Sequence, residues 1–128
     1  MRFTVSLLAV LMLAVLMLAS PVRAEDYEKG PNGGLMLDVA GIDAELLTSG
    51  TKVTINVFDA DKPVPVPTRG YTAAVLVVSG KARETVALAP SGDNSLTGDA
   101  KTAITPDATV TLTIRTAEGK SGQVKFRK

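Results

Sequence analysis

Past Gly34, apolar and polar residues alternate with a period of two almost to the end of the chain. Successive side chains of a β-strand point to opposite faces of its sheet, so this alternation is typical of strands with one buried face. Groups rich in Gly, Ser, Asn, Asp or Pro separate the runs, as turns between strands do. The pattern therefore predicts an all-β domain, with no helix after the N-terminal segment.

Eight runs carry this pattern, and they set the expected topology. We expect the first three to form a meander, with Gly41 as a bulge or tight bend between the first two. The run that begins at Tyr71 is the most apolar and is rich in β-branched residues, which predicts a central strand covered on both faces. Pro90 is expected to stop the fifth run. The runs span residues 35–40, 42–46, 53–58, 71–78, 84–89, 95–97, 109–116 and 123–127.

A proline-rich segment interrupts the series of runs. Pro63, Pro65 and Pro67 fall within residues 59–68, and each removes a backbone donor and keeps the chain extended. We expect this segment to be an edge or a crossover, and to mark the place where the chain changes sheets.

The number and spacing of the runs indicate the fold class. About 7–8 short strands joined by turns predict an immunoglobulin-like antiparallel β-sandwich, with a small β-barrel as the alternative. Residues 35–128 form this domain in the prediction. Residues 25–34 lack periodicity, which indicates a flexible N-terminal tail. The chain contains no cysteine, so neither disulfides nor thiolate metal sites support the core.

Residues 1–24 have the organisation of a secretory signal peptide. Arg2 supplies the positive charge, residues 3–19 form an apolar stretch, and Val22-Arg23-Ala24 provides small residues where signal peptidase reads the chain. We expect a helical signal peptide cleaved after Ala24, and hence a periplasmic or secreted protein with no stable membrane anchor. The alternative is an uncleaved transmembrane anchor, which needs about 20 apolar residues.

Cleavage changes the sign of the net charge. The whole chain has 14 Lys and Arg against 13 Asp and Glu, a net charge of +1. Because Arg2 and Arg23 leave with the signal peptide, 12 basic and 13 acidic residues remain, a net charge of −1. We therefore expect neither nucleic acid nor anionic lipid as a partner, since no basic field remains.

The residue types present argue against catalysis. The chain has no histidine and no cysteine, which excludes Ser-His and Cys-His nucleophile systems. Ser49-Gly50-Thr51-Lys52 matches the S-x-x-K motif of serine acyltransferases, but here it spans a glycine-containing hairpin turn. We expect a protein that is not an enzyme, with no catalytic residue and no cofactor.

Carboxylates are the remaining candidates for metal ligands. Asp59 and Asp61 lie at the end of a run, and their oxygens suit a hard cation such as calcium. Too few other acids accompany them to fill its coordination sphere, so a solvated turn is the favoured interpretation. The C-terminal Lys125-Phe126-Arg127-Lys128 is interpreted as a strand with Phe126 inward and the cations outward, where they discourage edge pairing.

One segment resembles a known family. Lys29, Gly30, Pro31, Asn32, Gly33 and Gly34 directly precede the first run. This segment resembles the His-Gly-Pro-His-Gly-Gly opening of small periplasmic β-sandwich proteins associated with heavy-metal efflux systems, and similar modules occur in some periplasmic efflux adaptors. The likeness continues through residues 57–65 and 86–98, and so spans most of the mature chain.

The resemblance implies a periplasmic sandwich whose relatives carry two histidines, natural soft-metal ligands, on a flexible tail. Lys29 and Asn32 stand at those positions here, and neither a protonated amine nor an amide oxygen replaces an imidazole ligand. The matching residues Gly30, Pro31, Gly33 and Gly34 equally suit a turn that begins the first strand.

These observations predict a non-enzymatic, exported binding or accessory module of the bacterial envelope, linked to metal efflux through contacts with an unidentified envelope protein. The alternative is a structural or adhesive sandwich that pairs through a strand edge. A metal-binding protein is a residual alternative. The sequence sets neither the ligand nor the oligomeric state.

Overall fold

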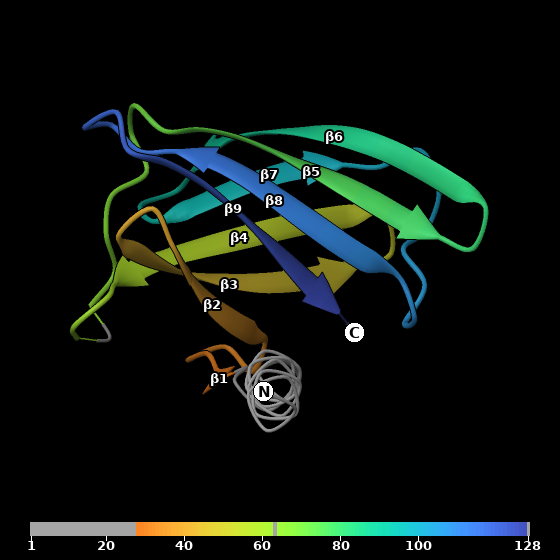
Figure 1. The fold of residues 1–128 in the computed structure, drawn as a ribbon, viewed down its shortest axis with the longest axis horizontal. Helices are drawn as coiled ribbons and strands as arrows, with labels where there is room; N and C mark the ends of the chain where they lie inside the picture. The colour runs from red at the N-terminus through yellow and green to blue at the C-terminus, as the bar shows by residue number, and fades with distance from the viewer. Residues whose placement is uncertain (1–27, 63, 128) are drawn as a thin grey trace, which may run out of the picture.

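The computed structural model describes residues 28–62 and 64–127, and every regular element within them is a β-strand (Figure 1). The expected signal peptide, with its cleavage site after Ala24, lies outside the described residues. The all-β prediction is confirmed for the described part. Its strands are β1 (Glu28–Lys29), β2 (Leu35–Val39), β3 (Ile42–Ser49), β4 (Lys52–Asp59), β5 (Thr72–Ser79), β6 (Ala82–Ser91), β7 (Ser95–Asp99), β8 (Thr109–Arg115) and β9 (Ser121–Arg127).

Neighbouring strands are all antiparallel and follow the order β1-β2-β3-β4-β7-β6-β5-β8-β9. The sheet curls like half of a barrel, so β9 returns toward β2 from the far end of this order (Figure 1). Gly122 at the start of β9 marks the contact, since a β-carbon there would lie 2.7 Å from Val39 Cγ2. A side chain at this position would hold the two ends of the sheet apart.

The predicted β2-β3-β4 meander is present, but its first connection differs from the prediction. Gly41 was expected as a bulge or bend. Val39 pairs with Ile42, so Ala40 and Gly41 form a complete two-residue hairpin turn, with φ angles of 52° and 84°. Positive φ at both central residues is the geometry of a type I′ turn, whose twist matches that of the flanking strands.

The proline-rich segment is a crossover, as predicted. It first runs beside the end of β4, where Asp59 N donates a hydrogen bond to Val64 O at 2.9 Å. It then passes Thr68, whose buried hydroxyl donates to Ser95 O at 2.9 Å. The chain next enters β5, which is separated from β4 in the sheet by β7 and β6. The crossover therefore carries the chain from one half of the curled sheet to the other.

Strand β6 is longer than predicted, because Pro90 does not stop it. The strand pairs with β5 as far as Leu88 and with β7 from Ala89 to Ser91. Pro90 stands in this second part, exposed and opposite Leu96. Because β6 no longer pairs with β5 at Pro90, the N–H group that proline lacks removes no hydrogen bond between these two strands. β6 thus links the two halves of the sheet.

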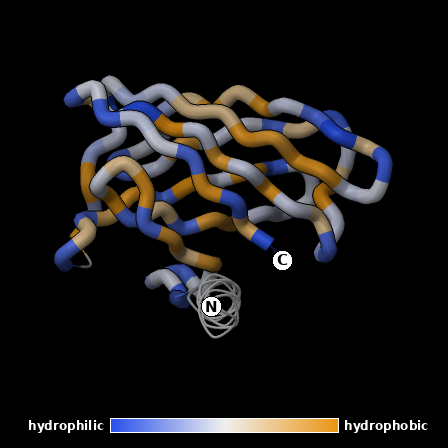
Figure 2. The backbone as a smooth tube through the Cα atoms, in the orientation of Figure 1, coloured by the Kyte–Doolittle hydropathy of each residue, from blue (hydrophilic) through white to orange (hydrophobic). Residues whose placement is uncertain are grey.

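The core collects apolar side chains from strands on both halves of the curl, and Figure 2 shows hydrophobic stretches along these strands. In β8, alternate residues Val110, Leu112 and Ile114 are buried, as a period of two requires. On neighbouring β9 the side chain of Phe126 has no exposed surface, which confirms its predicted inward orientation.

Strand β5 is central, as predicted, because it lies between β6 and β8. It is not fully covered on both faces: Val75 and Val77 are buried, while the residues between and beside them are half-buried or exposed. The curl accounts for the difference, since a single curled sheet packs only its inner face against its own strands.

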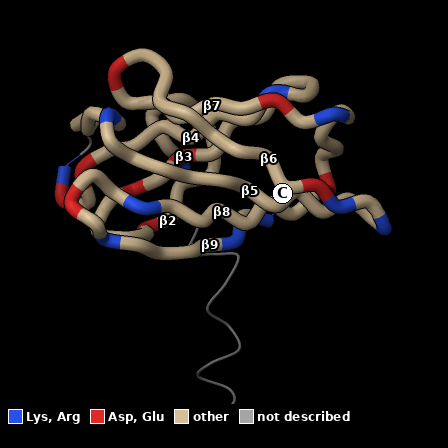
Figure 3. Tube along the Cα trace, turned by 90° about the horizontal axis from the view of Figure 1, so that it is seen from above, with Lys and Arg blue, Asp and Glu red and all other residues tan. Residues whose placement is uncertain are grey.

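Charged residues of both signs gather at the turns and the two ends of the molecule, and the middle of the strands is largely free of them (Figure 3).

In the described ranges, no helix is long and apolar enough to cross a membrane.

Candidate functional site

The segment that carries the family resemblance, residues 29–34, forms a turn, here called the 29–34 turn, that one side chain of β3 holds in place. Asn32 N and Gly34 N donate hydrogen bonds to Glu45 Oε2 at 2.8 and 2.9 Å, and Asn32 Nδ2 donates to Glu45 Oε1 at 2.9 Å. The Glu45 side chain has no exposed surface. A buried carboxylate is costly unless hydrogen bonds satisfy it, and these three donors supply them.

The glycines of the turn are required by this close packing. A β-carbon at Gly30 would overlap the Glu45 side chain, and one at Gly34 would overlap Leu46 O. The backbone also closes on itself, because Gly30 N donates to Gly34 O at 2.8 Å and Gly33 N donates to Gly30 O at 2.9 Å. Gly33 has a φ of 86°, which favours glycine. Glycine is therefore needed here for steric and conformational reasons.

Residues 25–34 were expected to form a flexible tail. The described part of this stretch is instead hydrogen-bonded to the sheet: β1 pairs with the start of β2, and the 29–34 turn follows directly. The structure thus shows the second interpretation of the motif, a turn that begins a strand. Lys29, Pro31, Asn32 and Gly33 are exposed, while Gly30 is buried.

Glu45 is the residue that sequence reasoning missed. Its run alternates apolar Ile42, Ala44 and Leu46 with acidic residues, which places Glu45 on the solvent face of the predicted strand. The alternation gives no sign that the 29–34 turn folds over this face. The one available signal is the glycine-rich segment itself, since glycines permit a close approach of backbone to another group.

The two aspartates proposed as weak metal candidates lie in a turn. Asp61 N donates to Asp59 Oδ1 at 2.8 Å, and both residues are exposed. This contact caps the backbone locally, as aspartates in turns commonly do. Over residues 28–62 and 64–127 the structure contains no group of three or more His, Cys, Asp or Glu side chains placed to hold a metal ion.

A different acidic pair lies on β2 and β3. Asp38 and Asp43 are direct cross-strand partners, and like charges in this position repel. Burial, the hydrogen bond with Asp38, and the charges of Asp38, Glu28 and Asp59 raise the pKa of Asp43 to about 7. The Oδ1 atom of Asp43 is buried without a hydrogen-bond partner in the described residues. Folding therefore favours the protonated form of this carboxyl.

The remaining motifs are structural. Ser49 and Lys52 face each other across the β3–β4 hairpin, with Gly50 at φ 60° between them, so the S-x-x-K match spans a strand turn, as interpreted from the sequence. Lys125 and Arg127 are exposed on β9, on either side of buried Phe126.

Comparison of the chain with protein-family models, with curated proteins and with solved structures finds no match.

Proposed function

We propose that this chain is a non-enzymatic binding module exported to the bacterial envelope, and that it holds a partner protein through the exposed side of the 29–34 turn. The observation that carries the proposal is the set of three hydrogen bonds from the turn to the buried Glu45 carboxylate. Such an arrangement fixes the shape of a surface loop on a rigid strand, which is how binding loops are commonly positioned.

The exposed chemistry of the turn favours a protein partner over a metal ion. Asn32, at one of the two histidine positions of the family motif, already donates to Glu45 from its backbone and its side chain. Lys29, at the other position, is an exposed amine, which is protonated at neutral pH. A preformed turn that offers a cation, a proline and backbone groups suits contact with a protein surface, because little conformational entropy is lost on binding.

We further propose that the fold is an immunoglobulin-like sandwich. Its two layers would be β1-β2-β3-β4-β7 and β6-β5-β8-β9, with β6 contributing Ala89 to Ser91 to the first layer. Support comes from the split pairing of β6 and from the crossover between β4 and β5. A small open barrel is the alternative, and the approach of β9 to β2 at Gly122 favours it.

Site-specific photo-crosslinking in intact cells tests the proposed contact. A photoreactive residue replaces exposed Pro31 in the turn, and the matched control replaces Lys81, exposed between β5 and β6. We expect one discrete crosslinked species from position 31 and none from position 81. Equal labelling at both positions, or none at position 31, would contradict the proposal. Edman sequencing of the purified protein should begin at Glu25 if the export prediction is correct.

Strand-edge pairing is the second candidate function. It is favoured by one observation: β9 ends the strand order and pairs with β8 alone over its full length. The exposed Lys125 and Arg127 oppose it, because charges on an edge strand discourage pairing with another chain. A concentration-independent monomer in analytical ultracentrifugation would argue against pairing between copies.

A further inference from the structure

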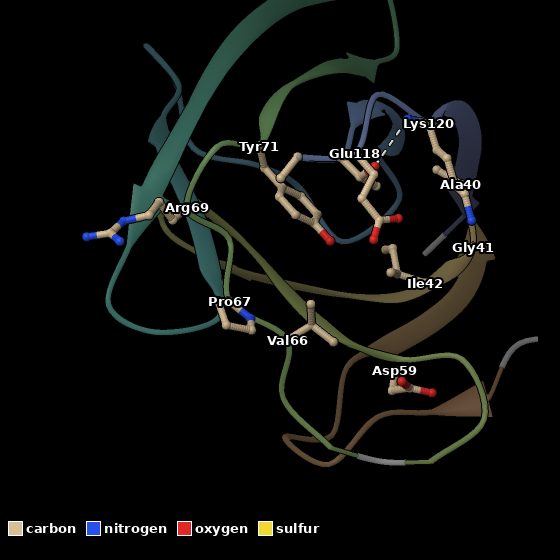
Figure 4. A pocket seen from close by; sticks show the side chains of 12 residues that line it. Ala40, Gly41, Ile42, Asp59, Val66, Pro67, Arg69, Tyr71, Glu118 and Lys120 are labelled. Atoms are coloured by element: carbon tan, nitrogen blue, oxygen red, sulfur yellow. Dashed lines mark hydrogen bonds between the residues drawn. The ribbon is translucent and has the colours of Figure 1, made fainter.

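A cleft of about 480 Å³ opens between three turns, well away from the 29–34 turn at the other end of β2. Its walls are the Ala40–Gly41 hairpin, residues 66–69 of the crossover, and residues 116–120 between β8 and β9. The volume lies within the range of small-ligand sites in proteins. We call it the Tyr71 cleft, because the Tyr71 hydroxyl points into it (Figure 4).

The walls of the Tyr71 cleft are held by backbone contacts. Thr116 N donates to Lys120 O at 2.8 Å and Lys120 N donates to Thr116 Oγ1 at 3.1 Å, which closes the hairpin that carries Glu118. On the facing wall, Gly70 adopts a φ of 84°, and a β-carbon there would lie 3.2 Å from Ala117 Cβ. The crossover and the hairpin are therefore in direct contact.

The lining combines the buried phenol of Tyr71 with two exposed carboxylates, Glu118 and Asp59. Tyr71 is 7% exposed, the Glu118 carboxylate extends toward its hydroxyl, and Asp59 lies on the opposite wall (Figure 4). Burial and the negative charge of Glu118 raise the pKa of Tyr71, so the phenol stays neutral. Ionised carboxylates accept hydrogen bonds, so Glu118 and Asp59 can receive them from a ligand.

Two cations, Arg69 and Lys120, also line the cleft. Arg69 points away from the interior (Figure 4). The Lys120 ammonium lies beside the Ala40–Gly41 turn, 3.6 Å from where a β-carbon of Gly41 would be. The Glu118 carboxylate, in contrast, faces the Tyr71 hydroxyl, and apolar Ile42 and Val66 line the space between Glu118 and Asp59. The space in front of Tyr71 thus offers carboxylate and phenol oxygens as partners for the N–H donors of a cation.

We propose that the Tyr71 cleft binds an organic cation, a primary ammonium or guanidinium group, with Glu118 and Asp59 as its counter-charges and Tyr71 as its aromatic wall. Ammonium N–H groups donate to the carboxylates and to the phenol oxygen, and the alkyl part of the ligand contacts Ile42 and Val66. A cation beside an aromatic face and carboxylates gains from both interactions. This site is independent of the proposed partner contact at the 29–34 turn.

The test is an NMR titration with agmatine and with cadaverine. It uses the uniformly ¹⁵N-labelled protein, purified as cells process it. We expect saturable shifts at the amides of Gly41, Tyr71 and Ala117 at millimolar ligand or below. Pentanol, the uncharged control, should leave these amides unmoved. Lack of saturable shifts there, or equal shifts with pentanol, would overturn the proposal.

Three variants distinguish binding in the Tyr71 cleft from nonspecific electrostatic attraction of the cation to surface carboxylates. Glu118→Gln and Asp59→Asn should each weaken agmatine binding about tenfold, equivalent to about 1.4 kcal/mol. Asp99→Asn, at an exposed position on β7, should leave binding unchanged. Equal loss in all three variants would refute the assignment. Melting temperatures confirm that each variant is folded, and Asn retains the Oδ1 acceptor that Asp61 N uses.

A final comparison distinguishes the two sources of such a cation. The peptide acetyl-Gly-Lys-Gly-amide presents a lysine ammonium on a polypeptide, whereas cadaverine is a free amine. Tighter binding of the peptide assigns the cleft to a basic side chain of a partner protein, and tighter binding of cadaverine assigns it to a small amine. If the peptide, cadaverine and agmatine all fail to bind saturably, the proposed site is refuted. The crosslinking result at position 31 would be unaffected.

Discussion

Replacing Glu45 with alanine should destabilise the whole domain, because this side chain has no exposed surface and accepts three hydrogen bonds. The backbone N–H groups of Asn32 and Gly34 lose their acceptor, at a cost of about 1 kcal/mol each. Loss of the one buried methylene group that alanine lacks, Cγ, adds about 1 kcal/mol. The Asn32 side chain is exposed and can bond to water. We therefore expect a loss of about 3 kcal/mol in the free energy of unfolding.

Urea unfolding followed by circular dichroism measures this loss. With an m-value of about 1.5 kcal/mol/M, the midpoint should fall by about 2 M. Glu45→Gln keeps one acceptor oxygen without the charge and should cost about 1 kcal/mol. The matched control is Glu84→Gln, since Glu84 accepts a single exposed hydrogen bond from Lys101 N at 2.8 Å and should change stability by less than about 0.5 kcal/mol. Equal midpoints for Glu45→Ala and Glu84→Gln would refute the reasoning.

Three further substitutions test other parts of the account. Folding raises the Asp43 pKa from 3.8 to about 7, so the stability that its protonated form contributes is complete below about pH 4 and is lost as the pH rises through 7. Asp43→Asn should therefore be more stable to urea than the parent at pH 8, by about 1 kcal/mol after allowance for solvent screening. At pH 4 the variant and the parent should be equally stable. A stability difference that does not depend on pH would contradict this. Gly34→Ala should cost about 2 kcal/mol or more in urea unfolding, because its β-carbon would overlap Leu46 O. The control is Gly50→Ala, at a position where the space is open and φ is 60°; it should cost about 1 kcal/mol. Equal losses for Gly34→Ala and Gly50→Ala would argue against close packing of Gly34 on Leu46 O. Ala40→Gly should raise stability by about 0.5 kcal/mol, since relief of the positive φ of 52° exceeds the added freedom of the unfolded chain; a lower melting temperature would contradict this.

The strands were predictable because their signal is local. Alternation along Val110, Leu112 and Ile114 fixes which face of β8 is buried whatever the neighbouring strands are. The crossover was predictable for a similar reason, since prolines remove ladder donors wherever they stand. Pro90 shows the limit of this rule. Whether a proline stops a strand depends on which partner occupies that side of the strand, and the partner comes from elsewhere in the chain.

The site was predictable only in part, because it depends on contacts distant in the sequence. The glycines of residues 29–34 indicated a turn, but nothing local linked them to Glu45, eleven residues beyond Gly34. The raised pKa of Asp43 likewise depends on the pairing of β2 with β3 and on charges brought near by folding. The Tyr71 cleft joins three turns from separate parts of the chain. Such groupings follow from topology, which alternation alone does not determine.

The central claim is that Glu45 converts a glycine-rich N-terminal segment into a fixed surface turn. Backbone ¹⁵N relaxation of Gly30, Asn32, Gly33 and Gly34 tests it most directly, because order parameters separate rigid from flexible backbone. We predict values of about 0.85, equal to those of β3, in the parent protein, and a fall in the Glu45→Ala variant, provided that it remains folded. Values below about 0.6 in the parent protein would show a flexible tail and would contradict the account.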